Sequence, residues 1–443
     1  MGCSGSKSAL SANNSHGASI AAVELSIALG NTFSEINLQG NVKEQLRELL
    51  QRLDHEASKY VNSKVDEVKS PDWHPSQAEV QLISAAWKCA RGTYNLGGTI
   101  ANTSYCTFRR EETLRGSYDG TVKVITSTVI EKTPEDVGES DLLPVLVLAI
   151  RGSASKMDHI VNANSRPRST RGFIVNLYYT FCQSGSLVVS VVDQRAEDLG
   201  AHSGFLNSVQ ALDSIIIARI NDCIQNFDRA NGQKPHILFT GHSAGGAVSQ
   251  ILYLQYISNQ AFNESAKFSC VTFGAPPCVT TSVDLSFYQP GGKTICLNIF
   301  NEFDFVTRAD KPYILSLVEV ARNMLNQPRK PLLPEPETSS EIIDASLKAT
   351  QDKEAELSSP KNEESHDQGP KTWKFSQPLY NHIGPSVVLL MRSENEMKLT
   401  AVEVTPAEFQ KLLFCRTAVH GKRIYEQRVE ALEQGHFNDR LGW

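Results

Sequence analysis

The chain lacks any stretch of about 18 consecutive apolar residues, which is the length needed to cross a bilayer. Residues 4–18 are rich in Ser, Asn, Gly and Ala, so the apolar core of a secretory signal is missing as well. Positive charge is not in excess, because 43 Lys and Arg stand against 49 Asp and Glu and leave a net charge of −6. We therefore expect no transmembrane helix, no secretory signal and no nucleic-acid partner.

Paired cysteine motifs are also missing. None of the nine cysteines stands in C-x-x-C spacing, and several lie within apolar, strand-like runs. This scattered, odd-numbered set predicts free thiols in a reducing compartment, with no disulfide framework and no zinc site. We expect no metal and no organic cofactor. The cysteines are Cys3, Cys89, Cys106, Cys182, Cys223, Cys270, Cys278, Cys296 and Cys415.

The first seven residues, MGCSGSK, fit the N-myristoylation pattern M-G-x-x-x-[ST]. Gly2 is the acceptor in that pattern, Ser6 is in the required place, and Cys3 is a neighbouring candidate for palmitoylation. One acyl chain binds a membrane weakly, whereas two hold it stably. We expect a cytoplasmic protein held peripherally on the cytosolic face of membranes, the alternative being a chance match in the tail.

The length of 443 residues suits one large domain with extensions. Helical periodicity over about 20–30 and 41–60 indicates a helical extension before that domain. A later stretch rich in Pro, Glu, Ser and Lys, with almost no aromatic residues, predicts disorder. The predicted organisation is a tail with the acylation motif (1–19), the helical extension (20–74), the first part of an α/β domain (75–326), a disordered insertion (327–371) and the rest of the domain (372–443).

Strand-like and helix-like segments alternate within the predicted domain. Several central strand runs are apolar on successive residues, as in strands buried on both faces. We predict an α/β fold with a mostly parallel central sheet and helices on both faces. The predicted strands are 121–130, 142–150, 186–193, 236–240, 268–273, 295–300, 386–391 and 398–404, and the predicted helices of the domain are 77–94, 203–226, 244–260 and 406–416.

The segment HILFTGHSAGGAVSQIL places the motif G-x-S-x-G between an apolar strand and an Ala-rich helix. This is the context of a nucleophile elbow, in which a tight turn exposes the serine hydroxyl. Flanking glycines permit the turn, and the start of the helix offers N–H groups to negative charge. We predict Ser243 as a nucleophile.

A serine nucleophile needs a base, and the base needs an orienting carboxylate. Both are expected in turns after the carboxyl ends of later strands. Asp304 follows the second strand after the elbow, while Asp310 lies further into the loop and Asp193 precedes the elbow. We predict Asp304 as the acid.

Two histidines compete for the role of base. His382 stands just before a predicted strand, which favours the opposite end of the sheet, whereas His420 follows the last strand and one helix. We predict His420 as the base. We interpret His236, ahead of its strand, and His242, within the elbow, as structural.

Acyl transfer also needs hydrogen-bond donors for a tetrahedral oxyanion. The backbone N–H of Ala244 is one donor by position. The second is expected after an earlier central strand, where Arg151-Gly152-Ser153 ends the run LLPVLVLAI.

Taken together, GHSAGG, the RGS turn, HSGF at 202–205, TFGAPP at 272–277, NEFD and a late H-x-x-x-x-Y resemble motifs of the class 3 lipase family, which has the α/β-hydrolase fold. The resemblance covers about 140–310 and 376–430. It implies a Ser243, Asp304 and His420 triad, with Ser153 and Ala244 forming the oxyanion hole. It also assigns His382 to a non-catalytic motif.

The chain departs from the family pattern in two places. Members commonly carry an Asp-Trp-x-x-Asp-like lid helix after the oxyanion turn, where this chain has His159 and Asn162 in place of the Trp and the second Asp. The aspartate usually found just before the late histidine is Val419. A lid this polar predicts weak activation by lipid interfaces.

The residues and the resemblance together predict a serine hydrolase of carboxylic esters in acylglycerols or phospholipids. A soluble esterase for short acyl chains is a second interpretation. A lipase-like scaffold without turnover is a third, which the complete Ser, His and Asp set disfavours. The identity of the acyl chain and head group stays open, since it depends on pocket shape.

Overall fold

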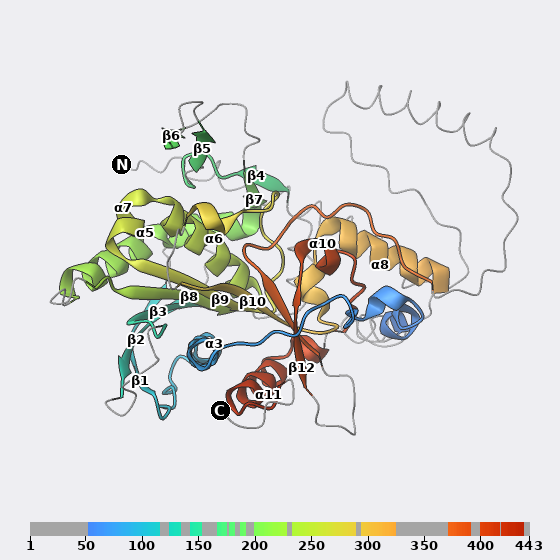
Figure 1. Cartoon of the computed structure of the whole chain (residues 1–443), viewed down its shortest axis with the longest axis horizontal. Coiled ribbons are helices and arrows are strands. Elements are labelled where there is room, and N and C mark those ends of the chain that lie inside the picture. Colours follow the sequence, from blue (N-terminus) through green and yellow to red (C-terminus); the bar gives the residue numbers. More distant parts are fainter. Residues whose placement is uncertain are drawn as a thin grey trace, which may run out of the picture.

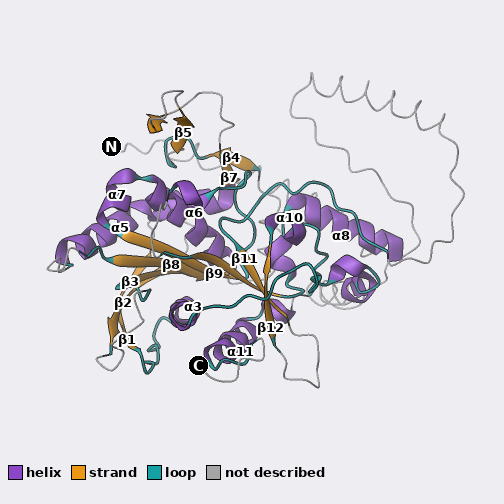
Figure 2. Ribbon diagram, in the orientation of Figure 1, coloured by secondary structure: helices purple, strands orange, loops and turns teal. Residues whose placement is uncertain are grey.

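The structure is a computed structural model that describes residues 52–115, 124–133, 142–152, 166–174, 177–181, 187–191, 199–227, 233–288, 294–324, 371–390, 399–416 and 418–437. The predicted tail with Gly2 and Cys3, Ser153, and most of the predicted insertion lie outside the described residues. An eight-stranded sheet organises the described chain, and its strands fan across the centre of Figure 2.

The sheet has the strand order β1-β2-β3-β8-β9-β10-β11-β12. Pairing is parallel from β3 through to β11 and antiparallel between β1 and β2, β2 and β3, and β11 and β12. All residues of β3, β8 and β11 are buried, as their unbroken apolar runs predict. The strands are β1 (Cys106–Arg115), β2 (Val124–Lys132), β3 (Leu146–Ile150), β8 (His236–His242), β9 (Lys267–Phe273), β10 (Cys296–Asn301), β11 (Ser386–Leu390) and β12 (Thr400–Val404).

Helices cover both faces of the sheet (Figure 1), so the predicted α/β fold is confirmed. On one face, α5 (Ser203–Asn226) and α6 (Ala244–Ser258) pack on side chains such as Phe239 of β8. On the other, α3 (Gln77–Gly92) and α11 (Lys422–Glu433) pack on the next side chain along, Leu238. Alternate residues of one strand therefore serve two separate cores.

The remaining described elements lie around the sheet and the helices on its two faces. Two small sheets pair β4 (Pro167–Ser169) with β7 (Gly200–His202), and β5 (Leu177–Phe181) with β6 (Leu187–Val191). The helices are α7 (Gln260–Ser265), α8 (Lys311–Met324) and α10 (Pro406–Phe409), with short 3-10 turns η1 (Val61–Ser63), η2 (Leu285–Phe287), η3 (Phe305–Arg308) and η4 (Ala418–His420).

Three predictions of secondary structure differ from the structure. The strand predicted over 186–193 pairs with β5 in a separate sheet. The helix predicted over 406–416 ends at Phe409, because Leu412, Leu413 and Phe414 extend into two different cores. No prediction covered β1, whose charged sequence CTFRREETLR forms an edge strand; charges suit such an edge because they oppose pairing with other chains.

Residues 52–65, which we call the clamp segment, connect parts of the chain that are distant in sequence. Leu53, Ala57 and Tyr60 pack in one apolar cluster with Phe305 and Trp373. The polar contacts of the segment begin with Asp54, whose carboxylate binds the Arg416 guanidinium at 2.7 Å. They end with the backbone N–H of Val65, which donates to the Glu302 carboxylate at 3.0 Å.

Asn62 makes the most concentrated contacts of the clamp segment. Its Nδ2 donates to the carbonyl oxygens of Trp373 at 2.8 Å and Lys411 at 2.6 Å. Its Oδ1 accepts from the Trp373 N–H at 2.9 Å, and its carbonyl oxygen accepts from the Leu413 N–H at 2.7 Å. The Asn62 side chain thereby joins the segment at Trp373 to the segment at Lys411.

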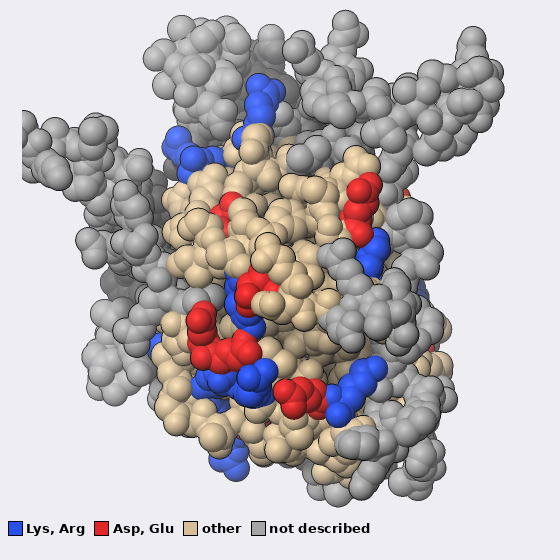
Figure 3. All heavy atoms as spheres, turned by 90° about the vertical axis from the view of Figure 1, so that its left-hand side faces the viewer, with Lys and Arg blue, Asp and Glu red and all other residues tan. Residues whose placement is uncertain are grey.

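Charges of both signs are interleaved on the face of the molecule shown in Figure 3. Where β1 approaches α5, Arg219 pairs with Glu111 and Asp222, and Arg109 pairs with Glu111 and Glu131. These pairs place charges of opposite sign next to one another on this face.

Within the described ranges, no helix has the length and apolar composition needed to span a membrane. The cysteines that the structure describes are free thiols, namely Cys89, Cys106, Cys223, Cys270, Cys278, Cys296 and Cys415. Burial raises the pKa of Cys89 to about 12, so that thiol stays protonated.

Replacing Asn62→Ala is expected to lower the free energy of unfolding by about 1 to 3 kcal/mol, because backbone groups of Trp373 and Lys411 lose their partner. The matched control is Asn226→Ala, since the exposed Asn226 amide contacts only Asp222 on its own helix. Urea unfolding of both variants measures the difference. Equal losses of unfolding free energy in the two variants would contradict the role of Asn62 in joining these segments.

Candidate active site

Ser243 occupies a sharp turn between β8 and α6, as the G-x-S-x-G motif predicts. Its φ of 63° and ψ of −136° are unusual for a residue with a side chain. The neighbouring glycines are required by close packing, since a Cβ at Gly245 would lie 2.2 Å from the Ile150 carbonyl oxygen, and one at Gly241 would lie 2.5 Å from the Gly245 backbone. The strained turn therefore depends on the motif glycines.

The structure brings together the three residues predicted as a triad. Ser243 Oγ lies 2.8 Å from His420 Nε2, and His420 Nδ1 lies 2.8 Å from Asp304 Oδ2. The side chains come from the elbow after β8, the turn after β10, and η4, and all three residues are buried. These contacts form one continuous chain of hydrogen bonds from the serine to the carboxylate.

The Asp304 carboxylate has further donors besides His420. Its Oδ1 accepts from the Val306 N–H at 3.0 Å, and its Oδ2 accepts from the Tyr425 hydroxyl at 2.8 Å. The Tyr425 hydroxyl in turn accepts from the Asn301 N–H at 3.1 Å. Burial raises the pKa of Tyr425 well above its usual value, so this tyrosine remains a donor. Tyr425 is the tyrosine of the late H-x-x-x-x-Y motif, whose partner no local pattern could identify.

Residues distant in sequence also hold the turn that contains Asp304. Asp304 and Arg416 form a parallel bridge, with the Arg416 N–H donating to the Phe303 carbonyl oxygen at 2.9 Å. The Arg416 guanidinium lies 3.9 Å from the Phe303 ring centroid and binds Asp54 of the clamp segment. Sequence reasoning missed these supports, because their members are more than a hundred residues apart in sequence.

The expected oxyanion donors are only partly described. Ala244 begins α6 directly after Ser243, so its N–H is at the amino end of that helix. Arg151 and Gly152 follow β3, which pairs with β8. The predicted second donor, Ser153, and the lid positions His159 and Asn162 lie outside the described residues.

The structure places the alternative acid away from His420. Asp310 Oδ1 accepts from the Tyr313 N–H, and Oδ2 accepts from the N–H groups of Leu379 and Tyr380. The second alternative, Asp193, lies outside the described residues.

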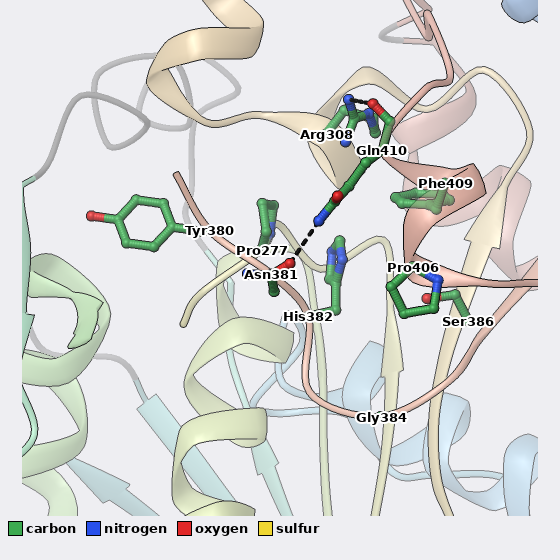
Figure 4. A pocket seen from close by; sticks show the side chains of 10 residues that line it. All are labelled: Pro277, Arg308, Tyr380, Asn381, His382, Gly384, Ser386, Pro406, Phe409 and Gln410. Atoms are coloured by element: carbon green, nitrogen blue, oxygen red, sulfur yellow. Dashed lines mark hydrogen bonds between the residues drawn. The ribbon is translucent and has the colours of Figure 1, made fainter. Parts of the chain in front are cut away.

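The competing histidine, His382, lies in a small separate pocket (Figure 4) whose lining includes none of the triad residues. His382 Nε2 donates to the Ala275 carbonyl oxygen at 3.0 Å. Burial lowers the pKa of His382 to about 3, so the ring is neutral near pH 7. Nearby, Gln410 Nε2 donates to Asn381 Oδ1 at 2.6 Å. His382 is thus engaged in a structural network.

The last two histidines differ from each other. His236 Nε2 is paired with Ser269 Oγ at 2.8 Å, far from Ser243 in the strand. His242, by contrast, stacks on the His420 ring with centroids 4.7 Å apart.

In the described part of the chain, no three His, Cys, Asp or Glu residues are grouped so as to hold a metal ion.

This arrangement has the parts needed to activate a serine. His420 Nε2 is placed to accept the Ser243 proton, and the Asp304 carboxylate is placed to orient the ring through Nδ1–H. The Ser243 oxygen activated in this way can attack the electrophilic carbon of a carbonyl group.

Residues 147–313 match the lipase (class 3) family. No curated protein matches the chain. Among solved structures, a Rhizomucor miehei lipase in complex with its propeptide has 16% identity and a TM-score of 0.36, over 57% of this chain and 74% of that one. The Lip2 lipase of Yarrowia lipolytica has 15% identity and a TM-score of 0.36, over 54% and 76%. A triacylglycerol lipase of Penicillium expansum has 13% identity and a TM-score of 0.31, over 52% and 71%.

Replacing His420→Ala is expected to slow the reaction of Ser243 with a fluorophosphonate about 10³-fold or more, because the hydroxyl loses its base. His382→Ala is the matched control and is expected to lower thermal stability while labelling proceeds near the wild-type rate. Labelling kinetics and thermal melts of both variants provide the comparison. A dead His382 variant beside an active His420 variant would reverse the assignment.

Proposed function

We propose that this chain, whose residues 147–313 match the lipase (class 3) family, hydrolyses carboxylic esters of membrane lipids through an acyl-enzyme. The observation that carries the proposal is the unbroken chain of hydrogen bonds from Ser243 through His420 to Asp304. Ser243 and Asp304 lie inside the matched segment, whereas His420 is supplied by the part of the chain after it. Acylglycerols and phospholipids are the proposed substrates.

The reaction proceeds in two halves. As Ser243 Oγ attacks the ester carbonyl carbon, its proton passes to His420 Nε2, and Asp304 stabilises the resulting imidazolium. The tetrahedral oxyanion accepts hydrogen bonds from the Ala244 N–H and from Ser153, the proposed oxyanion hole. Collapse breaks the ester C–O bond, and the departing alcohol takes the proton from His420.

Water then completes the cycle. His420 takes a proton from the water molecule, whose oxygen attacks the acyl carbonyl carbon. Collapse of the second tetrahedral intermediate returns the proton to Ser243 Oγ and releases the fatty acid. Every proton transfer in both halves uses the same nitrogen, His420 Nε2.

We further propose that acylation keeps the enzyme at the cytosolic face of membranes. Gly2 would carry myristate and Cys3 palmitate, with the Ser-rich and Asn-rich residues that follow acting as a tether. The polar segment in place of the usual lid supports this proposal, because an enzyme with little apolar surface of its own needs another means of staying near lipid.

Replacing Ser243→Ala is expected to reduce hydrolysis of a p-nitrophenyl acyl ester about 10³-fold or more without unfolding the chain, because the nucleophile is lost. Circular dichroism controls for folding, and fluorophosphonate labelling of the wild type tests the nucleophile directly. Wild-type protein that neither labels nor turns over would favour the scaffold interpretation. Residual activity near wild type would show that another residue attacks.

Replacing Gly2→Ala is expected to move the protein from the membrane to the soluble fraction, because no myristate can attach. Cys3→Ser is expected to do so partially, while activity on a water-soluble ester stays unchanged in both variants. Cell fractionation with metabolic acyl labelling makes the measurement. Unlabelled, soluble wild-type protein would reduce the motif to coincidence.

A further inference from the structure

His242, the residue before the nucleophile, lies directly against the base. Its ring is buried and stacks on the His420 ring at 4.7 Å between centroids, with an angle of 29° between the planes. Its Nε2 lies 3.1 Å from the His420 carbonyl oxygen. His242 therefore touches both the side chain and the backbone of the base.

The hydrogen bonds of His242 fix its tautomer. A carbonyl oxygen can only accept, so the contact with His420 requires a proton on His242 Nε2. In a neutral ring, Nδ1 is then an acceptor, and the Tyr94 hydroxyl lies 3.1 Å from it. Tyr94 is consequently the donor in that second contact.

Tyr94 connects this histidine to the turn after β3. A Cβ at Gly152 would lie 2.4 Å from the Tyr94 hydroxyl oxygen, so the phenol packs closely against that turn. Burial raises the pKa of Tyr94 to about 12, so the phenol stays protonated.

Two cations hold the Tyr94 ring in place. Lys422 Nζ, two residues after the base, lies 3.8 Å from the ring centroid, and the Arg151 guanidinium lies 5.8 Å from it. Tyr94, just after the end of α3, thus contacts the turn at Arg151 and Gly152, His242 beside the nucleophile, and Lys422 at the start of α11.

We infer that Tyr94 and His242 are positioning residues that hold the catalytic base through one directed hydrogen-bond chain. The chain runs from the Tyr94 O–H to His242 Nδ1 and from His242 Nε2–H to the His420 carbonyl oxygen. The inference rests on the proposed function, since it assigns a role within the same site.

A neutral His242 has a second consequence for the reaction. When His420 accepts the Ser243 proton, its ring becomes positive, and a charged ring stacked against it would oppose that step. By donating to Nδ1, Tyr94 favours the uncharged form of His242. The chain therefore sets both the position and the charge environment of the base.

The tautomer can be tested without any activity. Nitrogen-15 NMR of protein labelled at its 11 histidines, with His242→Gln used to assign the signal, reports which ring nitrogen carries the proton. We expect the His242 signal of the Nε2–H tautomer at pH 7. An Nδ1–H tautomer or a charged ring would overturn the inference.

Kinetics test the positioning role. Tyr94→Phe removes one hydrogen-bonding hydroxyl and is expected to lower kcat for a water-soluble ester about tenfold, with KM changed less than twofold. His242→Gln keeps a neutral amide that can accept from Tyr94 and donate to His420, so we expect a smaller loss than with His242→Leu. If the chain acts as a unit, combining Tyr94→Phe with His242→Leu costs less than the product of the single losses.

Tyr105→Phe is the matched control, because the Tyr105 hydroxyl binds Glu433 at the far end of α11. It is expected to change stability but not kcat. Unchanged kcat in Tyr94→Phe, with Ser243-dependent turnover in the wild type, would overturn the inference and leave the proposed function intact. A wild type without turnover would instead overturn the proposed function, and with it the role that the inference gives to Tyr94 and His242.

Discussion

The candidate site depends on one constraint, which is that the fully buried carboxylate of Asp304 needs hydrogen-bond donors in place of water. Three donors meet it, from the backbone of η3, from His420 and from Tyr425. Each donor comes from a different element, so satisfying one carboxylate fixes η3, η4 and α11 relative to one another. The geometry of the base follows from this requirement, as does the burial of the tyrosine.

The sheet makes that convergence achievable. Parallel strands end at the same edge, so the turns after β3, β8 and β10 meet there although they are far apart in sequence. Helices cover the two faces of the sheet (Figure 1). The base arrives by another route, through the extended chain up to Arg416, which pairs with the acid turn.

Local pattern was enough to predict the parts of the site that depend on neighbours in sequence. The elbow around Ser243 is such a case, because its strand, glycines and helix are contiguous in sequence. The buried strands are another, because runs of apolar residues predict them. Asp304 and His420 could be ranked above Asp310 and His382 from strand order together with the family resemblance. Tyr94 could not be predicted, since nothing near it in the sequence records Gly152, His242 or Lys422. The end of α10 at Phe409 has the same cause: burial of the following residues overrides helical periodicity.

The clamp segment gives synthesis of this protein a fixed order of events. Asp54 is 362 positions before its partner Arg416, so at roughly 5–20 residues per second it waits roughly 20 to 70 s for that partner to be made. Ser243 is made about halfway through that interval, and His420 is made only after Arg416. The amino-terminal sites that we propose for acylation leave the ribosome before any of these. The chain of hydrogen bonds from Ser243 to Asp304 is therefore complete only after the last segment of the chain has been made and has docked.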